Sequence, residues 1–108
     1  MFKLAPATFK REITVKVPVD GGFESQTMTV TYNVIPMDKS SEMLAQGGEG
    51  LIDFVNKITK RVDDIAGDDG KQLEWNDEVR DQLLNVPYVW AAILDGYKLA
   101  MGEARVKN

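Results

Sequence analysis

The sequence predicts an α+β domain in which an antiparallel β-hairpin, at about residues 9–35, is followed by about four helices packed on one face. Residues 9–18 and 27–34 alternate between apolar and polar side chains, which is typical of strands with one buried face. Most of the chain from about residue 38 to 104 instead shows apolar side chains at helical spacing. We expect a single domain over residues 1–108, because this length suffices for one core.

The predicted hairpin has one apolar face. The apolar residues of its first strand on this face are Phe9, Ile13, Val15 and Val17. Those of its second strand are Met28, Val30, Tyr32 and Val34. Asp20-Gly21-Gly22 lies between the strands and favours a tight turn, because glycine adopts positive φ at little cost. An isolated hairpin is marginally stable in water, so we expect the later helices to cover this face.

Two helices are expected in the middle of the chain. Asp38 or Ser40 can cap a first short helix that ends near Gln46. Gly47-Gly48 then breaks the helical pattern, because glycine disfavours a helix interior. A second helix is expected over about residues 49–59, where apolar side chains recur at helical spacing.

Two further helices are expected near the end of the chain. The Asp69-Gly70 pair favours a tight turn, so we interpret residues 60–75 as a short, weak hairpin or an ordered loop. Asn76 is a suitable cap for a third helix, which we expect to end near Asn85 because the residue before a proline avoids the helical region. A fourth helix is expected over residues 87–104, entered through a proline in its first turn.

The composition argues against an enzyme. The chain has no histidine and no cysteine, so it lacks the commonest general base, the commonest metal ligand and any thiolate nucleophile. Four aspartates do lie close together, at Asp63, Asp64, Asp68 and Asp69. Their spacing does not match a calcium loop, so we interpret them as a solvated loop, with a metal-dependent enzyme as the weaker alternative. We predict no catalytic residues, no cofactor and no metal site.

The charge and hydropathy also limit the possible partners. The net charge is -4 and the basic residues are scattered, whereas nucleic-acid binding requires a basic patch. The longest uncharged apolar run covers residues 86–94, far below the ~20 residues that span a bilayer. The N-terminus lacks the apolar run of a signal peptide. We therefore expect no nucleic-acid binding, no membrane association, no secretion and a cytoplasmic location.

The expected fourth helix is apolar on nearly every side. Between Val86 and Met101 only Asp95 and Lys98 are charged. Such a helix must be buried on several sides, and a chain of 108 residues offers little protein to surround it. One stripe of this helix consists of small residues that allow another element to approach closely: Val89, Ala92, Ile93, Gly96 and Ala100.

A bulkier part of the same helix is the candidate site for binding a protein partner. Aromatic side chains are enriched at interface hot spots, and large exposed apolar patches mark interaction sites. The candidate partner-binding residues are Trp90, Tyr97, Leu94, Met101 and Tyr88. A second copy of the chain is one partner that this surface suits. The alternative is that both parts of the helix lie in the core, one under the hairpin and one against the other helices.

The second half of the chain contains a series of short motifs. They are Asp68-Asp69-Gly70 before Leu73-Glu74-Trp75, the pair Leu83-Leu84, the run Asn85-Val86-Pro87-Tyr88-Val89, Tyr97 with Ala100, and Lys107-Asn108 at the end. Together with the alternating N-terminal strand and its Asp20-Gly21 turn, these motifs resemble those of the tail assembly chaperones of long-tailed bacteriophages and prophages. The resemblance covers nearly the full length and implies a small acidic protein with an N-terminal hairpin followed by helices.

The resemblance also implies a function. Members of the family hold the tape-measure protein soluble while the tail tube polymerises around it, and are then shed. For this chain it implies a tape-measure partner, many copies acting together, no catalysis and a location in the cytoplasm of a bacterial host. The alternative is a small structural component of a phage tail or neck, which would remain in the virion.

Overall fold

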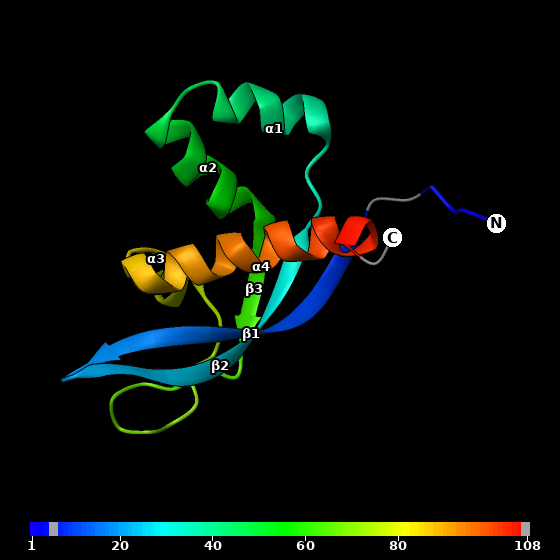
Figure 1. Ribbon diagram of the computed structural model, residues 1–108. Helices are drawn as coiled ribbons and strands as arrows, with labels where there is room; N and C mark the ends of the chain where they lie inside the picture. The colour runs from blue at the N-terminus through cyan, green and yellow to red at the C-terminus, as the bar shows by residue number, and fades with distance from the viewer. Residues whose placement is uncertain (5–6, 107–108) are drawn as a thin grey trace.

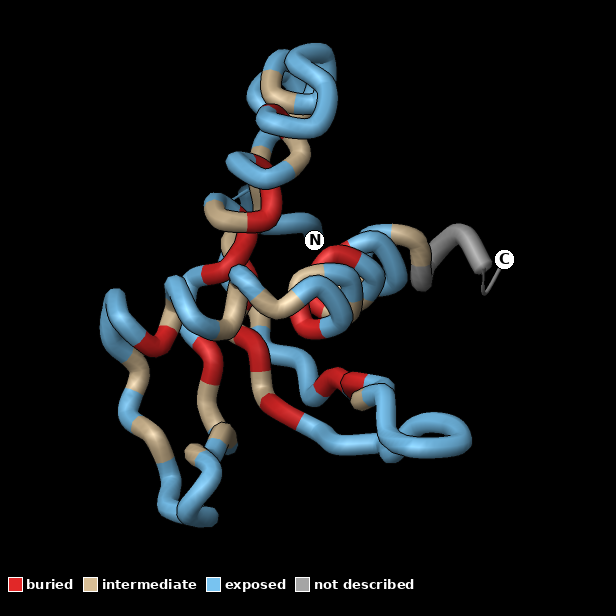
Figure 2. The backbone as a smooth tube through the Cα atoms, turned by 90° about the vertical axis from the view of Figure 1, so that its left-hand side faces the viewer, coloured by how far each residue is buried: buried red, intermediate tan, exposed pale blue. Residues whose placement is uncertain are grey.

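The computed structural model describes residues 1–4 and 7–106. Its elements, in chain order, are β1 (Thr8–Val19), β2 (Gly22–Asn33), α1 (Met37–Leu44), α2 (Gly48–Ile58), β3 (Thr59–Asp63), α3 (Asp77–Leu84) and α4 (Pro87–Val106) (Figure 1). The predicted α+β class is confirmed, with the antiparallel hairpin first and four helices after it. Buried positions gather where the strands, α2 and α4 meet (Figure 2).

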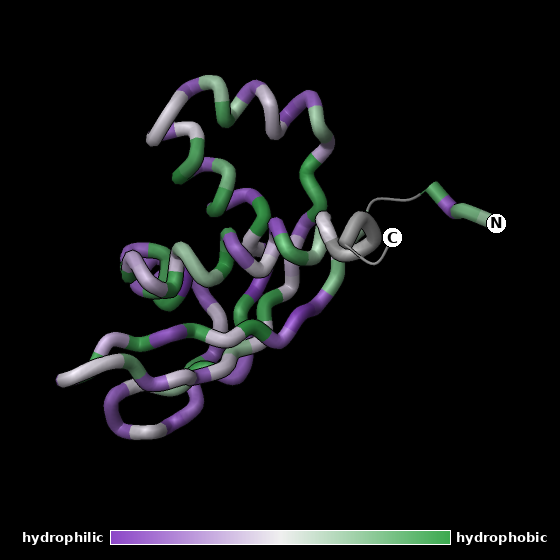
Figure 3. Tube along the Cα trace, viewed as in Figure 1, coloured by the Kyte–Doolittle hydropathy of each residue, from purple (hydrophilic) through white to green (hydrophobic). Residues whose placement is uncertain are grey.

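The hairpin has the predicted buried face. β1 and β2 pair in an unbroken antiparallel register, and Asp20 and Gly21 form the turn between them. Gly21 has a φ of 79°, in the left-handed region that glycine adopts without strain. Hydrophobic and hydrophilic residues alternate along both strands (Figure 3). The buried members of the apolar face are Ile13, Val15, Met28, Val30 and Tyr32.

A third strand occupies residues that the sequence assigned elsewhere. We expected the second helix to end near Thr59 and residues 60–75 to form a hairpin or loop, but β3 pairs antiparallel with β2. The sheet order is therefore β1-β2-β3. β3 is too short to show a clear alternation, and its partner lies about thirty residues earlier in the chain, so local patterning does not reveal the pairing. The rest of the segment is a loop closed by a single bridge between Ala66 and Gln72.

The helix starts agree with the sequence at α2 and α3 but not at α1. Asn76 caps α3, because its side-chain oxygen accepts a hydrogen bond from the Val79 N–H at 2.9 Å. Gly47 stands at the N-cap of α2 with a φ of 74°, as expected of a helix break. The proposed caps of α1 are wrong: α1 begins directly after Pro36, so Asp38 and Ser40 lie inside its first turn. Pro36 is itself extended, with a ψ of 148°, and its carbonyl oxygen accepts a hydrogen bond of 3.0 Å from the Ser40 N–H, so the helical hydrogen bonds already begin before either polar residue could act as a cap.

Helix α4 covers the apolar face of the hairpin (Figure 1). Gly96 makes this possible, because a Cβ atom there would lie 2.5 Å from the Tyr32 Oη atom and 3.0 Å from the Ile13 Cγ2 atom. The Tyr32 hydroxyl donates a hydrogen bond of 2.7 Å to the Ile93 carbonyl oxygen of α4. The hairpin of the same chain therefore packs against the predicted stripe of small residues on α4.

Replacing Gly96 by alanine tests this close approach. Alanine favours a helix by ~1 kcal/mol over glycine, but at this position it would overlap Tyr32. We expect Gly96→Ala to lower the free energy of unfolding by about 1–3 kcal/mol, as overpacking does. Gly102→Ala is the matched control in the same helix: its Cβ meets no atom within 4 Å, so it should raise stability by up to ~1 kcal/mol. Equal effects in urea melts would contradict the packing described here.

The Tyr32 side chain is fully buried, and this affects its ionisation. Burial, with the charge of Asp95 as the smaller cause, raises the pKa of Tyr32 above its ordinary value near 10. Ionising the phenol would place a negative charge in the core and remove the proton that it donates to Ile93. The folded state therefore holds this proton more tightly than the unfolded state does.

Stability should consequently fall at alkaline pH. Because the pKa of Tyr32 is raised in the folded state, its contribution to the free energy of unfolding is fully present below about pH 10. This contribution is lost as the pH rises further, because the unfolded chain releases the proton first. We expect Tyr32 to contribute a decline of up to about 1.4 kcal/mol per pH unit above pH 10. Tyr32→Phe should be less stable at neutral pH, but its free energy of unfolding should decline less steeply above pH 10. If urea melts show the same pH dependence for the two proteins, this assignment is wrong.

Candidate protein-binding site

An apolar pocket opens between α1, α2 and α4. Its volume is about 370 Å³. We call it the apolar pocket, and its lining residues are Leu44, Leu51, Phe54, Leu94, Tyr97, Lys98, Met101 and Gly102. Because one charged side chain accompanies mainly apolar ones, the pocket suits an apolar partner surface.

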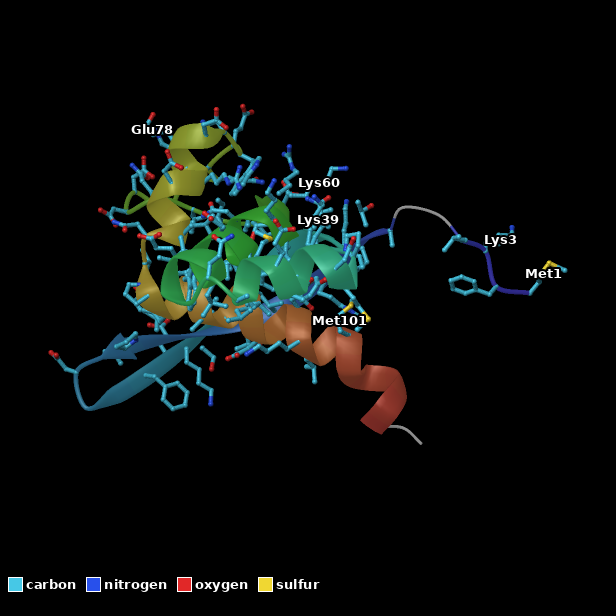
Figure 4. The ribbon with its side chains drawn as sticks, turned by 90° about the horizontal axis from the view of Figure 1, so that it is seen from above. Met1, Lys3, Lys39, Lys60, Glu78 and Met101 are labelled. Carbon is cyan, nitrogen blue, oxygen red and sulfur yellow. The ribbon has the colours of Figure 1, made fainter. Side chains whose placement is uncertain are left out.

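Helix α1 forms one rim of the apolar pocket while burying none of its own side chains. It packs against α2 at Gly50, where a Cβ atom would overlap the backbone carbonyl of Met43. This contact leaves Leu44, at the end of α1, 47% exposed. Met101 lines the pocket from α4 and is 45% exposed. In the view from above it projects next to α1 (Figure 4), although α4 lies below α1 in Figure 1.

The floor of the pocket belongs to the core, and this corrects the prediction for two candidate anchors. Leu94 and Tyr97 are each only 6% exposed. The Tyr97 ring meets Phe54 edge-on at a centroid distance of 5.5 Å and lies 5.8 Å from the Tyr32 ring. Its hydroxyl oxygen accepts a hydrogen bond of 3.1 Å from the Ile35 N–H. Tyr97 therefore joins α4 to the sheet and to α2, and neither residue is an exposed anchor.

Trp90 is also placed differently from the prediction. Its side chain is half-buried and packs against the core. The indole Nε1 is buried without a hydrogen-bond partner in the structure. An unpaired buried donor costs roughly 1–3 kcal/mol, so packing must outweigh this cost. Trp90 is thus a core-flanking residue rather than a freely exposed anchor.

Tyr88 lies at a different surface from the other candidates. It is 39% exposed and lines a groove of about 740 Å³ between β1 and α4. Leu99, which is 65% exposed, lines the same groove. We call this the β1 groove. Tyr88 and Met101 stand about 20 Å apart along α4. The structure therefore brings Leu94, Tyr97 and Met101 to the apolar pocket but places Tyr88 at a separate surface.

A third depression, between α1, α2, β3 and α3, is polar and carries both signs of charge. Arg80 crosses it and donates through Nη2 to the Asn56 carbonyl oxygen at 2.6 Å. This bond ties α3 to α2. Basic and acidic side chains occur in nearly equal number around the polar depression, so it does not form the concentrated basic patch that nucleic-acid binding requires.

Two further features are absent from the part of the chain that the structure describes. Within residues 1–4 and 7–106, no group of three or more acidic, histidine or cysteine side chains is arranged to hold a metal ion. Over the same residues, none of the helices combines the length and apolarity needed to cross a bilayer.

The sequence analysis missed the contribution of α1 and α2 to the apolar pocket. Leu51 and Phe54 were assigned to a helix by their spacing, and Leu44 received no role. The available signal was the composition of the first short helix, in which Met37, Met43 and Leu44 are its apolar residues. A short helix with few apolar residues buries little of its surface, so some of its apolar side chains tend to stay exposed.

Comparison of the chain with protein-family models, with curated proteins and with solved structures gives no match.

Proposed function

We propose that this protein is a tail assembly chaperone, which binds the tape-measure protein and keeps it soluble during assembly of a phage tail in the bacterial cytoplasm. The observation that carries the proposal is the apolar pocket with its exposed rim at Leu44 and Met101. A tape-measure protein is helical and rich in apolar residues, and an amphipathic helix binds by laying its apolar face in a groove of this kind. The motif resemblance noted above supports the same assignment.

A role in binding rather than catalysis is consistent with the chemistry of the chain. Histidine and cysteine are absent from the sequence. Among the residues whose side chains the structure describes, only Tyr32 has a clearly displaced pKa, and its hydroxyl bonds α4 to the sheet inside the core. We propose that the protein has no enzymatic activity and acts in several copies on one long partner, so that self-association is part of its function.

The pocket assignment predicts which surface changes abolish solubilisation. The wild-type chain, co-expressed with the tape-measure protein that it is proposed to bind, should bring that protein into the soluble fraction. Leu44→Asp combined with Met101→Asp places charge on the pocket rim and should weaken binding roughly thirtyfold, as loss of a hot spot does. Both residues are about half-exposed, so the variant should keep its melting temperature within a few degrees.

Ile52→Asp is the matched control. Ile52 is 54% exposed on α2 but does not line the apolar pocket, so its replacement should leave solubilisation intact. If the rim variant still solubilises the partner, the pocket assignment is wrong. If the wild type does not solubilise the partner, the chaperone proposal fails. Detection of the chain by mass spectrometry in purified mature virions would instead favour the structural tail or neck component.

A further inference from the structure

The outer edge of β1 carries backbone groups that point away from the sheet. β1 is an edge strand in the order β1-β2-β3, and its register with β2 has no bulge. The Val34 N–H donates to the Ala7 carbonyl oxygen at 3.0 Å, which makes Ala7 and Val34 a hydrogen-bonded pair. Antiparallel pairs alternate, so the odd-numbered residues of β1 face β2. The backbone N–H and C=O groups of Lys10, Glu12, Thr14 and Lys16 therefore point outward.

This edge borders open space. The β1 groove, with its volume of about 740 Å³, lies between Glu12, Thr14 and Lys16 on one side and α4 on the other. No strand of the described residues pairs with this edge. An unpaired edge is a template for another strand, and addition of a strand here would also cover the exposed Tyr88 and Leu99 of α4.

The side chains along the edge complement a second copy of themselves. In an antiparallel pairing about a two-fold axis at Thr14, Glu12 of each copy stands directly opposite Lys16 of the other. On the chain's own β2, the residues opposite Glu12 and Lys16 are the uncharged Thr29 and Ser25. Within the chain, the Lys16 Nζ atom lies 4.9 Å from the centroid of the Phe23 ring of β2, and no carboxylate stands opposite it on that strand. Opposite charges on directly facing residues stabilise strand pairs, so each copy would supply the other with an opposite charge.

Other two-fold registers are less favourable. An axis at Glu12 would face Glu12 with its own copy, and an axis at Lys16 would face two lysines. An axis at Arg11 would pair Lys10 with Glu12 but would bring two guanidinium groups together on the helix side of the sheet. An axis at Ile13 would face Lys10 with Lys16. An axis at Val15 would leave Glu12 and Lys16 opposite uncharged residues. Pro18 has no N–H to donate, so it ends the ladder near the hairpin tip and limits continued strand addition. The charge pattern therefore selects the register centred on Thr14.

We propose that two copies of this chain associate through the outer edges of β1, antiparallel and centred on Thr14. The two three-stranded sheets then join into one sheet of six strands, with the helices of both copies on the same face. This assigns a surface and a register to the self-association proposed above, and it does not depend on the identity of the tape-measure partner.

Disulfide trapping tests the register directly, because the chain contains no cysteine of its own. Directly opposed residues in a hydrogen-bonded antiparallel pair have Cα atoms about 5.5 Å apart, within the range of a disulfide. Thr14→Cys should therefore form a covalent dimer on mild oxidation of the purified protein. Thr27→Cys is the matched control: it lies opposite Thr14 on β2, so in the dimer the two copies of residue 27 are separated by three strand spacings, or ~14 Å.

Charge reversal tests the pairing without introducing a cysteine. Glu12→Lys or Lys16→Glu alone places like charges opposite each other at two symmetric positions and should raise the dimer dissociation constant about tenfold or more. The double variant restores opposite charges and should recover wild-type dimerisation in sedimentation experiments. All four side chains involved are exposed, so circular dichroism should show an unchanged fold.

Three outcomes would overturn the proposal. These are equal crosslinking at positions 14 and 27, a double variant as weak as the single ones, and a chain that stays monomeric at every concentration. In the last case, amide protection of β1 that arises only with another protein would identify the edge as a site for a foreign strand. Because crosslinking, charge reversal and sedimentation all use the purified chain alone, failure of the dimer proposal is distinct from failure of tape-measure binding.

Discussion

The structure depends on the close seating of α4 on the hairpin at Gly96. An isolated hairpin of this length cannot bury its apolar face by itself, and α4 is too apolar to stand in water. Gly96 allows the helix backbone to reach Tyr32, whose hydroxyl then satisfies a helix carbonyl at Ile93. Each element thus covers the apolar surface that the other would expose, and one side chain joins them through both packing and a hydrogen bond.

The remaining elements are arranged around this contact. Tyr97, one turn after Ile93 on the same helix, reaches the backbone N–H of Ile35 and the ring of Phe54. The α4 helix therefore positions α2 as well as the sheet. α3 is secured separately, through Arg80 and the carbonyl oxygen of Asn56. α1 packs mainly against α2, has Met43 partly buried against the core and has no fully buried side chain, so it is the helix least supported by the core.

The seating of α4 also decides which apolar side chains remain available. The face of α4 that meets the hairpin is buried by this contact. Leu94 and Tyr97 are buried in the same core cluster as Phe54 of α2. On the part of α4 whose side chains the structure describes, the large apolar side chains that stay exposed are Met101 at the apolar pocket and Tyr88 and Leu99 at the β1 groove. In the proposed dimer the β1 groove is occupied by the second copy while both apolar pockets stay open, so a dimer would offer two sites to one long helical partner.

Local patterning in the sequence determined most of the secondary structure. The alternation around the Asp20-Gly21 turn predicted the hairpin and its buried face, and Asn76 predicted the start of α3. These features depend on residues that are neighbours in the sequence, so the sequence alone predicts them. The same is true of the break at Gly47.

Tertiary contacts decided the rest. β3 exists because it pairs with a distant strand, and nothing in five residues reveals that partner. Likewise, the sequence of a helix that is apolar on every side does not reveal which of its faces packs against the rest of the same chain. The sequence therefore determined that α4 would be buried on several sides and that its small residues would admit a close neighbour. Only the folded chain decided that Tyr97 and Leu94 lie in the core and that the exposed rim combines Met101 with Leu44, because burial depends on elements that meet only in three dimensions.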